Sequence, residues 1–175
     1  MKILETERLI LREYTADDFD ALFAIVGDAE TMKHFPKPYS EKGTRYWIDW
    51  SLDHCRRHGY GFWAVILKET GTLIGNCGIT MQNIDGEILP EIGYHFHKDH
   101  WRKGYAKEIC RAVLEWGFTH TEYDTFWSYM TAGNTASIAT AYTMGMKKIK
   151  SYDDDHYGHM FACAVTRAEW EALRK

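Results

Sequence analysis

The segment from residue 91 to residue 118 constrains the fold of this chain more than any other part of it. It has the pattern of a strand, then a short loop of small and basic residues, then an amphipathic helix. A helix begins with unpaired backbone N–H groups and the positive end of its dipole, which suits a phosphate group. Gly104 and Ala106 leave room for a ligand near the backbone, and Arg102 and Lys103 add positive charge. The segment therefore predicts a site for a phosphorylated ligand.

Two common nucleotide-binding motifs do not occur in this sequence. There is no GxGxxG fingerprint of a dinucleotide-binding fold, and no acidic residue follows on a second strand. There is also no Gly-Lys-Ser/Thr sequence of a P-loop. The structural alternative for the segment is an ordinary helix that happens to follow a glycine-containing loop.

The length and composition predict one soluble globular domain. A chain of 175 residues can bury one sizeable core but is short for two, so a single domain over residues 1–175 is expected. Hydrophobic residues make up 45% and charged residues 26%, which is ordinary for globular proteins. The net charge of −4 argues against a general nucleic-acid binder, because such proteins neutralise phosphates.

The cysteines and the N-terminus indicate a cytoplasmic protein without a membrane partner. Cys55, Cys77, Cys110 and Cys163 are far apart and show no CxxC spacing, so neither a disulfide scaffold nor a structural zinc site is expected. Residues 1–13 mix charged and apolar types, unlike a signal peptide. No apolar run approaches the ~20 residues that cross a bilayer.

The order of the patterns predicts a mixed α/β fold (α+β) with a twisted, mostly antiparallel sheet flanked by helices. Strands are expected near residues 8–14, 60–67, 73–80, 91–97, 125–130, 147–152 and 159–165. Helices are expected after Thr15, from Ser40 to about His58, over residues 107–118, from Thr135 to Met144, and after the capping box Thr166 to Glu169. Residues 83–87 and 153–156 are expected to form loops.

A second informative stretch covers residues 133–146. Asn134 follows a strand and can cap the next helix, which is its structural role. Ser137 lies one turn further on, where serine is mildly unfavourable, and this indicates a use for its hydroxyl group. Gly145 matches the residue that ends a helix in the left-handed conformation.

Together the two stretches resemble the GNAT superfamily of acetyl-CoA-dependent N-acetyltransferases. More narrowly, they resemble its RimJ/RimL-like branch of ribosomal-protein N-terminal acetyltransferases. The opening Glu5-Thr-Glu-Arg-Leu-Ile-Leu-Arg12 is similar to the start of that branch. Its later landmarks match in order at Glu91-Ile-Gly-Tyr94, at Trp101-Arg-Lys-Gly-Tyr-Ala106, and at Asn134-x-x-Ser137 followed by Gly145-Met146. The resemblance covers nearly the whole chain.

The resemblance implies that a loop wraps the pyrophosphate of acetyl-CoA with its backbone N–H groups. That loop comprises Trp101, Arg102, Lys103, Gly104, Tyr105 and Ala106. The branch often has glycine at the position of Arg102, so this arginine is expected to add a phosphate contact. The strand of Tyr94, His95 and Phe96 is expected to pair its backbone with the pantetheine arm. Asn134 is expected to hydrogen-bond that arm or its acetyl end.

Acetyl transfer to an amine requires a base, a stabilised oxyanion and a proton for the departing thiolate. A lysine-like amine has a pKa of ~10, so a base must take its proton near neutral pH. Glu91 is the expected base, directly or through water, and His95 on the same strand face is the alternative. The backbone N–H of Phe96 or a neighbour is expected to polarise the thioester carbonyl. Ser137, near the thiol in this branch, is expected to protonate the thiolate.

The chain departs from the superfamily at one catalytic position. Many members have a tyrosine four residues before the last glycine motif, where this chain has Ala141. Tyr142 follows one place later and would point elsewhere, because a helix turns about 100° per residue. The tyrosine role is therefore not transferred to this chain.

The expected function is an N-acetyltransferase for a primary amine, either a protein N-terminus or a small molecule. The alternative is a CoA-binding regulatory or interaction module without turnover, which stays open because the tyrosine is missing. Four aromatic residues are expected to line the acceptor mouth or to anchor a helix to the core: Phe35, Tyr39, Trp47 and Trp50. No metal is expected, because the histidines at 95, 97 and 100 rarely complete a tetrahedral site. Monomer and homodimer are both compatible with the sequence.

Overall fold

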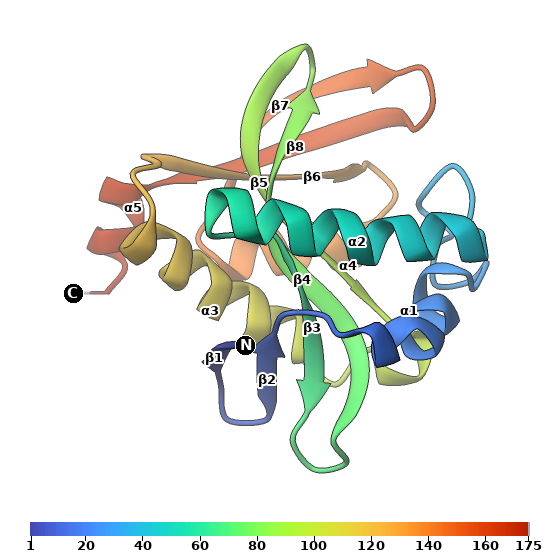
Figure 1. The fold of residues 1–175 in the computed structure, drawn as a ribbon. Helices are drawn as coiled ribbons and strands as arrows, with labels where there is room; N and C mark the ends of the chain where they lie inside the picture. The colour runs from blue at the N-terminus through green and yellow to red at the C-terminus, as the bar shows by residue number, and fades with distance from the viewer. Residues whose placement is uncertain (175) are drawn as a thin grey trace.

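The computed structural model describes residues 1–174, which form an eight-stranded sheet with helices packed against it (Figure 1). The strands are β1 (Lys2–Glu5), β2 (Leu9–Arg12), β3 (Phe62–Leu67), β4 (Thr72–Ile84), β5 (Glu87–Phe96), β6 (Thr125–Thr131), β7 (Lys147–Asp154) and β8 (Gly158–Thr166). The helices are α1 (Phe19–Val26), α2 (Glu41–His58), α3 (Tyr105–His120), α4 (Thr135–Thr143) and α5 (Arg167–Ala172), with short 3-10 turns η1 (Ala16–Asp18) and η2 (Lys98–His100).

The sheet confirms the predicted mixed α/β class. Neighbouring strands follow the order β1-β2-β3-β4-β5-β6-β8-β7. Every neighbouring pair is antiparallel except β5 and β6, which run parallel. The parallel pairing lies at Glu91, where the segment of residues 91–118 begins.

The structure corrects three predicted boundaries. The strand expected over residues 8–14 is shorter, and β1 before it was missed because it is a largely exposed edge strand of mixed charge. Residues 83–87 are not a loop, since β4 and β5 continue to a tight turn at Asp85 and Gly86, whose φ angles are 54° and 84°. An Asp-Gly pair adopts this turn readily. Likewise, β7 continues through Asp154 before it turns.

A separate hydrophobic core lies on each face of the sheet. All six residues of β3 are buried, and they alternate between the two cores. Trp63 and Val65 pack with α3, whereas Phe62 and Ala64 pack with α1 and α2. In Figure 1, α2 crosses in front of the middle strands and α1 lies beside it. These two cores fix both faces of the sheet around its centre.

The helix α2 begins and ends where the sequence predicts. The Oγ atom of Ser40 accepts a hydrogen bond from the N–H of Gly43 at 3.2 Å, and Gly59 ends the helix with a φ of 78°. Such an N-cap and a left-handed glycine satisfy backbone groups that the helix leaves unpaired. Within residues 1–174, no helix is both long enough and apolar enough to cross a membrane.

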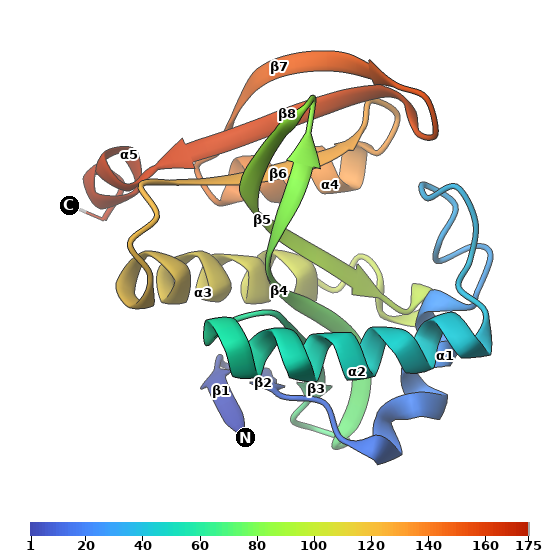
Figure 2. The ribbon, with the colours of Figure 1, turned by 45° about the horizontal axis from the view of Figure 1, so that its top comes forward.

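The strands β5 and β6 are paired at Glu91 and Trp127 and diverge beyond this pair, as Figure 2 shows. The hydroxyl group of Ser128 donates a hydrogen bond to the carbonyl oxygen of Ile92 at 2.6 Å just past the paired residues. Beyond Ile92 the sheet has a gap, and α3 and α4 lie in contact beside it. The candidate site lies at this gap.

Candidate active site

The gap opens into a cavity of about 1170 Å³, above the range of ~300–1,000 Å³ that is usual for small-molecule sites. The predicted residues that line it are Glu91, Tyr94, His95, Phe96, Trp101, Arg102, Gly104, Tyr105, Ala106, Asn134 and Ser137. The aromatic residues expected at an acceptor mouth, Phe35, Tyr39, Trp47 and Trp50, line the same cavity. The side chain of Lys103 is exposed, and this residue lies outside the lining.

The strand β5 divides this cavity into two sides, because its side chains alternate between the faces of the sheet. Glu91 and His95 point to the face of α2, where the rings of His95 and Trp47 lie 5.4 Å apart. Tyr94 points to the opposite face, where its hydroxyl oxygen lies 3.0 Å from Oγ of Ser137 on α4. We call these the α2 side, defined by Glu91 and His95, and the α4 side, defined by Tyr94 and Ser137.

Glu91 is a buried carboxyl group on the α2 side, with 8% of its surface exposed. Burial disfavours the charged form and raises the pKa of Glu91 to about 8. Gly93 leaves space for the carboxyl group, because a Cβ atom there would lie 3.0 Å from Oε2 of Glu91 and 3.0 Å from Cζ of Phe62. Within residues 1–174, no side chain or backbone group hydrogen-bonds this carboxyl, which leaves it available to a ligand.

His95 is held in place by Asn76 on β4. The Oδ1 atom of Asn76 accepts a hydrogen bond from the backbone N–H of His95 at 3.1 Å and lies 2.9 Å from its Nδ1 atom. An amide oxygen only accepts, so Nδ1 carries the proton and Nε2 is a free acceptor. Burial lowers the pKa of His95 to about 4, so the ring is neutral at pH 7. Its Nε2 atom is buried and has no hydrogen-bond partner in the described chain.

Tyr94 and Ser137 form a hydroxyl pair on the α4 side, which the sequence did not reveal. Burial is the main cause that raises the pKa of Tyr94 to about 12, so the phenol keeps its proton. Asn134 caps α4 by accepting a hydrogen bond from the N–H of Ser137 at 3.2 Å. Tyr142 is 52% exposed and lies outside the cavity lining, as its position in the helix predicts. The phenol that lies next to Ser137 therefore comes from β5 and not from α4.

The loop before α3 presents backbone N–H groups to the cavity. Arg102 and Gly104 both adopt positive φ angles, 61° and 83°, which turn the chain sharply into the helix. The helix starts at Tyr105, two residues earlier than the predicted residue 107. Its first helical hydrogen bond is donated by the N–H of Glu108 to the carbonyl oxygen of Gly104 at 3.1 Å. The N–H groups of residues 105–107 therefore have no partner within the helix.

Trp101 connects this loop to β5. Its Nε1 atom donates a hydrogen bond to the carbonyl oxygen of Phe96 at 2.7 Å. The ammonium group of Lys33 lies 5.0 Å from the centre of the Trp101 ring. The loop thus keeps a fixed position relative to the strand that borders the gap.

Arg8 holds the loop from the other side, a contact that sequence reasoning missed. Its backbone N–H and its Nε atom donate to the carboxylate of Glu108 at 2.9 and 2.6 Å. Its Nη1 atom donates to the carbonyl oxygen of Lys103 at 2.8 Å. The hydroxyl of Thr6 adds a third hydrogen bond to the same carboxylate at 2.5 Å. The chain opening similar to that of the RimJ/RimL-like branch thus braces the loop.

The backbone of β5 also offers unpaired groups to the gap. His97 donates its N–H to the carbonyl oxygen of Ile74 at 3.0 Å, so His97 and every second residue before it direct their backbone groups to β4. Ile92, Tyr94 and Phe96 direct theirs toward the gap. Because Ser128 and Trp101 occupy the carbonyl groups of Ile92 and Phe96, the N–H and C=O groups of Tyr94 and the N–H of Phe96 remain for a ligand.

The chain also matches a known protein family. A model of the acetyltransferase (GNAT) domain matches residues 8–147 of this chain. The chain belongs to the GNAT acetyltransferase family. It is 34% identical to the uncharacterized protein YkkB of Bacillus subtilis (strain 168), over 85% of this chain and 87% of that protein. It is 32% identical to the uncharacterized N-acetyltransferase p20 of Bacillus licheniformis, over 85% of this chain and 84% of that protein.

Among solved structures, RimL, a ribosomal L7/L12 alpha-N-protein acetyltransferase in complex with coenzyme A, has the same fold. The TM-score is 0.79 at 16% sequence identity, and the match covers 95% of this chain and 98% of RimL. At this identity the likeness shows that the two chains share a fold. This GNAT chain is therefore an acyltransferase whose donor is acetyl-CoA. The geometry of the site bears on which amine is its acceptor.

Proposed function

We propose that this GNAT protein transfers the acetyl group of acetyl-CoA to a primary amine at the gap between β5 and β6, with the amine on the α2 side of β5. The observation that carries the proposal is the placement of two opposite proton-handling groups around this gap. The buried carboxyl of Glu91 can accept a proton on the α2 side, and the Tyr94–Ser137 hydroxyl pair can donate one on the α4 side. An acyl transfer to an amine needs both steps.

The loop before α3 suits the pyrophosphate of the donor. The free N–H groups of residues 105–107 supply hydrogen-bond donors and the positive end of the α3 dipole. The positive φ of Gly104 places the backbone, without a side chain, at the entrance. Arg102 is exposed beside it and lines the cavity, so its guanidinium can reach a phosphate group. These features support the assignment of residues 101–106 to donor binding.

The free backbone groups of Tyr94 and Phe96 suit the amide-rich arm of the donor. Such an arm can add to the open edge of β5 as a strand would. The N–H of Phe96, which has no partner in the described chain, is available to polarise a thioester carbonyl. The Nδ2 atom of Asn134 is not used in the helix cap and can donate to the same arm, because only its Oδ1 atom binds Ser137.

The proposed proton path starts at the acceptor. The carboxylate of Glu91 takes a proton from the ammonium group, directly or through one water molecule, so that a neutral amine can attack the thioester carbon. The amine–carbon bond forms and the carbon–sulfur bond breaks, and the thiolate takes a proton from Ser137, which Tyr94 supports through its hydroxyl. The nitrogen releases its second proton as it becomes an amide, and this proton replaces the one that Ser137 has given. A base with a pKa near 8 is well matched to this task near neutral pH.

The CoA-binding module without turnover is less well supported. The sequence kept it as an alternative because Ala141 replaces the usual tyrosine of α4. The hydroxyl of Tyr94, however, approaches the same helix at Ser137, so a phenol is present at the gap. This supply of a phenol from β5 favours the enzyme.

A thiol-release assay with acetyl-CoA and a panel of primary amines tests the proposal. We expect CoA release that depends on the amine. The product should be heavier than the amine by ~42 Da, because one hydrogen is replaced by an acetyl group. Protein that binds CoA tightly and acetylates none of the amines would refute the transferase function.

A further inference from the structure

Resting on the proposed function, we infer that the acceptor is a small primary amine with a single positive charge on an apolar, preferably aromatic, body. Nothing in the family assignment specifies this class. Three features of the α2 side carry the inference: the aromatic residues that form its wall, the charged groups that line it, and the loop that covers it.

The wall of the α2 side is a continuous aromatic cluster drawn from separate parts of the chain. The ring of Phe35 lies 4.8 Å from His95 and 6.4 Å from Tyr157, measured between centroids. Trp47 lies 5.4 Å from His95 and 5.1 Å from Tyr39. Neutral rings of this kind stabilise a bound ligand by burying its apolar part, and their faces attract an ammonium group.

Glu91 is the one carboxyl of the lining that meets no basic group in the described residues. The other lining carboxyl, Glu30, lies 3.9 Å from Lys98, which itself pairs with Asp28 at 2.8 Å. A polyamine or aminoglycoside would therefore bring several charges to a side that can pair one. Burying the others without partners is costly.

The basic residues of the lining lie away from the aromatic wall. Lys33 lies over Trp101, and Lys98 is already paired with Asp28 and Glu30. Arg102 and Lys107 flank the start of α3, where the donor phosphates are assigned. An amino acid would place its own carboxylate against the aromatic wall, whose rings have no Lys or Arg stacked on them within residues 1–174. An amine without a carboxylate is therefore preferred.

The loop between α1 and α2 covers the α2 side. Phe35 contacts Tyr157 in the β7–β8 turn, and Nδ1 of His34 lies 3.4 Å from Oγ1 of Thr131 at the end of β6. Figures 1 and 2 both show this loop beside the β7–β8 hairpin. A cover that spans these two elements leaves room for a small molecule but obstructs the N-terminus of a folded protein, which must continue out of the site.

Four probes separate these features. 2-Phenylethylamine has one charge and an aromatic body, phenylalanine adds a carboxylate, Phe-Gly-Gly amide adds a continuing peptide, and spermidine replaces the ring by further charges. Binding to the CoA-loaded protein is measured by calorimetry, and turnover is measured separately by thiol release from acetyl-CoA. We expect 2-phenylethylamine to bind at least ~10-fold more tightly than each of the others and to have the highest kcat/KM.

The outcomes distinguish this inference from the proposed function. Better binding or faster acetylation of phenylalanine, spermidine or the peptide would overturn the acceptor class but leave the transferase standing. Preferred binding of 2-phenylethylamine with no acetylation of any probe would support the acceptor class and refute the transferase. Failure of all four probes to bind would overturn the inference.

Variants of the cover test whether the aromatic wall makes the selection. Phe35→Ala and Tyr157→Ala, on different elements, should each raise the KM for 2-phenylethylamine ~10-fold or more and leave the KM for acetyl-CoA unchanged. Phe161→Ala is the matched control, because Phe161 is also partly buried but lies outside the cavity lining. Equal effects of the cover variants and Phe161→Ala would contradict the inference.

Discussion

Arg8 and Glu108 are 100 residues apart in sequence, yet four nitrogen atoms of the arginine hold the carboxylate and the loop before α3 together. Arg8 is thus a positioning residue for the loop that we assign to the donor pyrophosphate. It touches the loop carbonyl of Lys103, and its Nη2 atom lies 3.3 Å from the position of a Cβ atom at Gly104.

Arg8→Ala should weaken donor binding while it spares the chemical step. The loop loses a brace, so the N–H groups at the start of α3 are less well oriented, and the KM for acetyl-CoA should rise ~3- to 10-fold with kcat nearly unchanged. Steady-state kinetics with acetyl-CoA as the varied substrate measures this split. Arg8→Lys keeps the charge but cannot span both acceptors, and it should retain most of the defect.

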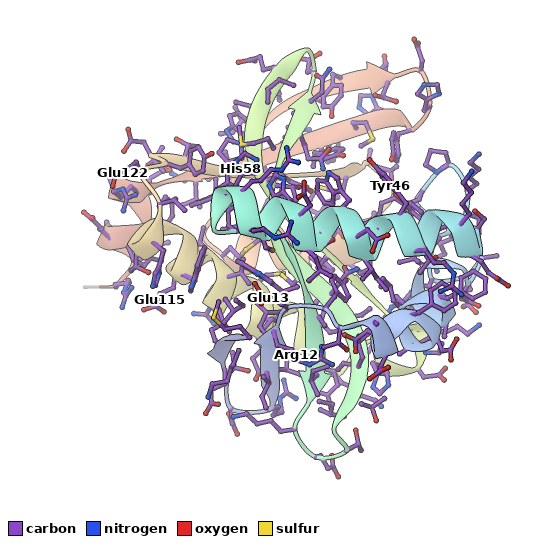
Figure 3. All side chains as sticks on the ribbon, viewed as in Figure 1. Arg12, Glu13, Tyr46, His58, Glu115 and Glu122 are labelled. Atoms are coloured by element: carbon purple, nitrogen blue, oxygen red, sulfur yellow. The ribbon has the colours of Figure 1, made fainter. Side chains whose placement is uncertain are left out.

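Arg12→Ala is the matched control for that experiment. Arg12 forms a two-pronged ion pair with Asp18 at 2.7 Å for each contact, away from the donor loop. Figure 3 shows Arg12 across α2 from Tyr46, which lines the cavity. Its loss should lower stability without changing the KM for acetyl-CoA, and an equal rise in KM for both variants would contradict the role of Arg8.

Arg102→Gly should change stability and donor affinity in opposite directions. The left-handed backbone of Arg102 costs a non-glycine residue about 1 kcal/mol, which glycine relieves. The lost guanidinium should weaken CoA binding, most clearly at low ionic strength, where phosphate contacts are least screened. Thermal melts and CoA titrations at two salt concentrations measure the two effects. Arg111→Ala removes an exposed charge from α3 outside the cavity lining, so its CoA affinity should stay close to that of the native protein.

Glu91→Gln should remove most of the activity. Glutamine cannot take a proton, so the rate should fall ~100-fold or more, and the native rise in kcat/KM as pH approaches about 8 should lose the contribution of Glu91. A pH–rate profile of both proteins measures this. A native profile with the same shape as that of Glu91→Gln would exclude Glu91 as the base.

The same substitution should alter how stability depends on pH. The folded protein keeps the Glu91 proton up to about pH 8, whereas an unfolded glutamate releases it near 4.5. Between these values the folded state binds more protons, so native stability falls as pH rises, by ~1.4 kcal/mol for each unit between the two pKa values at most. Urea unfolding at pH 5 and pH 9 should show a smaller loss for Glu91→Gln than for the native protein.

Tyr94→Phe and Ser137→Ala should each lower kcat, and their effects should not multiply. The two hydroxyl groups lie 3.0 Å apart, so removal of either one breaks the same proton-donating pair. We expect each single variant to lose ~10- to 100-fold in kcat with unchanged acetyl-CoA affinity. The kcat of the double variant should be only slightly below that of the less active single variant. Tyr142→Phe removes an exposed hydroxyl outside the cavity lining and should have no effect. Multiplicative losses would show that the pair does not act as a unit.

Local signals predicted the parts of this fold that depend on neighbouring residues. Ser40 and Gly59 bound α2 because capping depends on a few adjacent backbone groups. The missed strand β1 carries no such signal, since an exposed edge strand needs little apolar alternation. The Asp85–Gly86 turn had a local signal that the reading of residues 83–87 as a loop overlooked.

For the site, most of the residues that the sequence predicted do line the cavity, but the sequence did not reveal their pairings. Alternation along β5 correctly placed Glu91 and His95 on one face. It could not show that Asn76 fixes the His95 ring or that Tyr94 reaches Ser137, because those contacts depend on how distant elements pack. The catalytic and binding roles of these residues stay predictions until the variants are measured.

The division of the cavity by β5 has a kinetic consequence. If the donor occupies the α4 side and the amine the α2 side, neither molecule has to pass the other to reach the gap. Either can arrive first, and CoA and the acetylated amine can depart through different openings. Initial-rate plots should then show intersecting lines, the pattern of a ternary complex, in place of the parallel lines of a ping-pong enzyme.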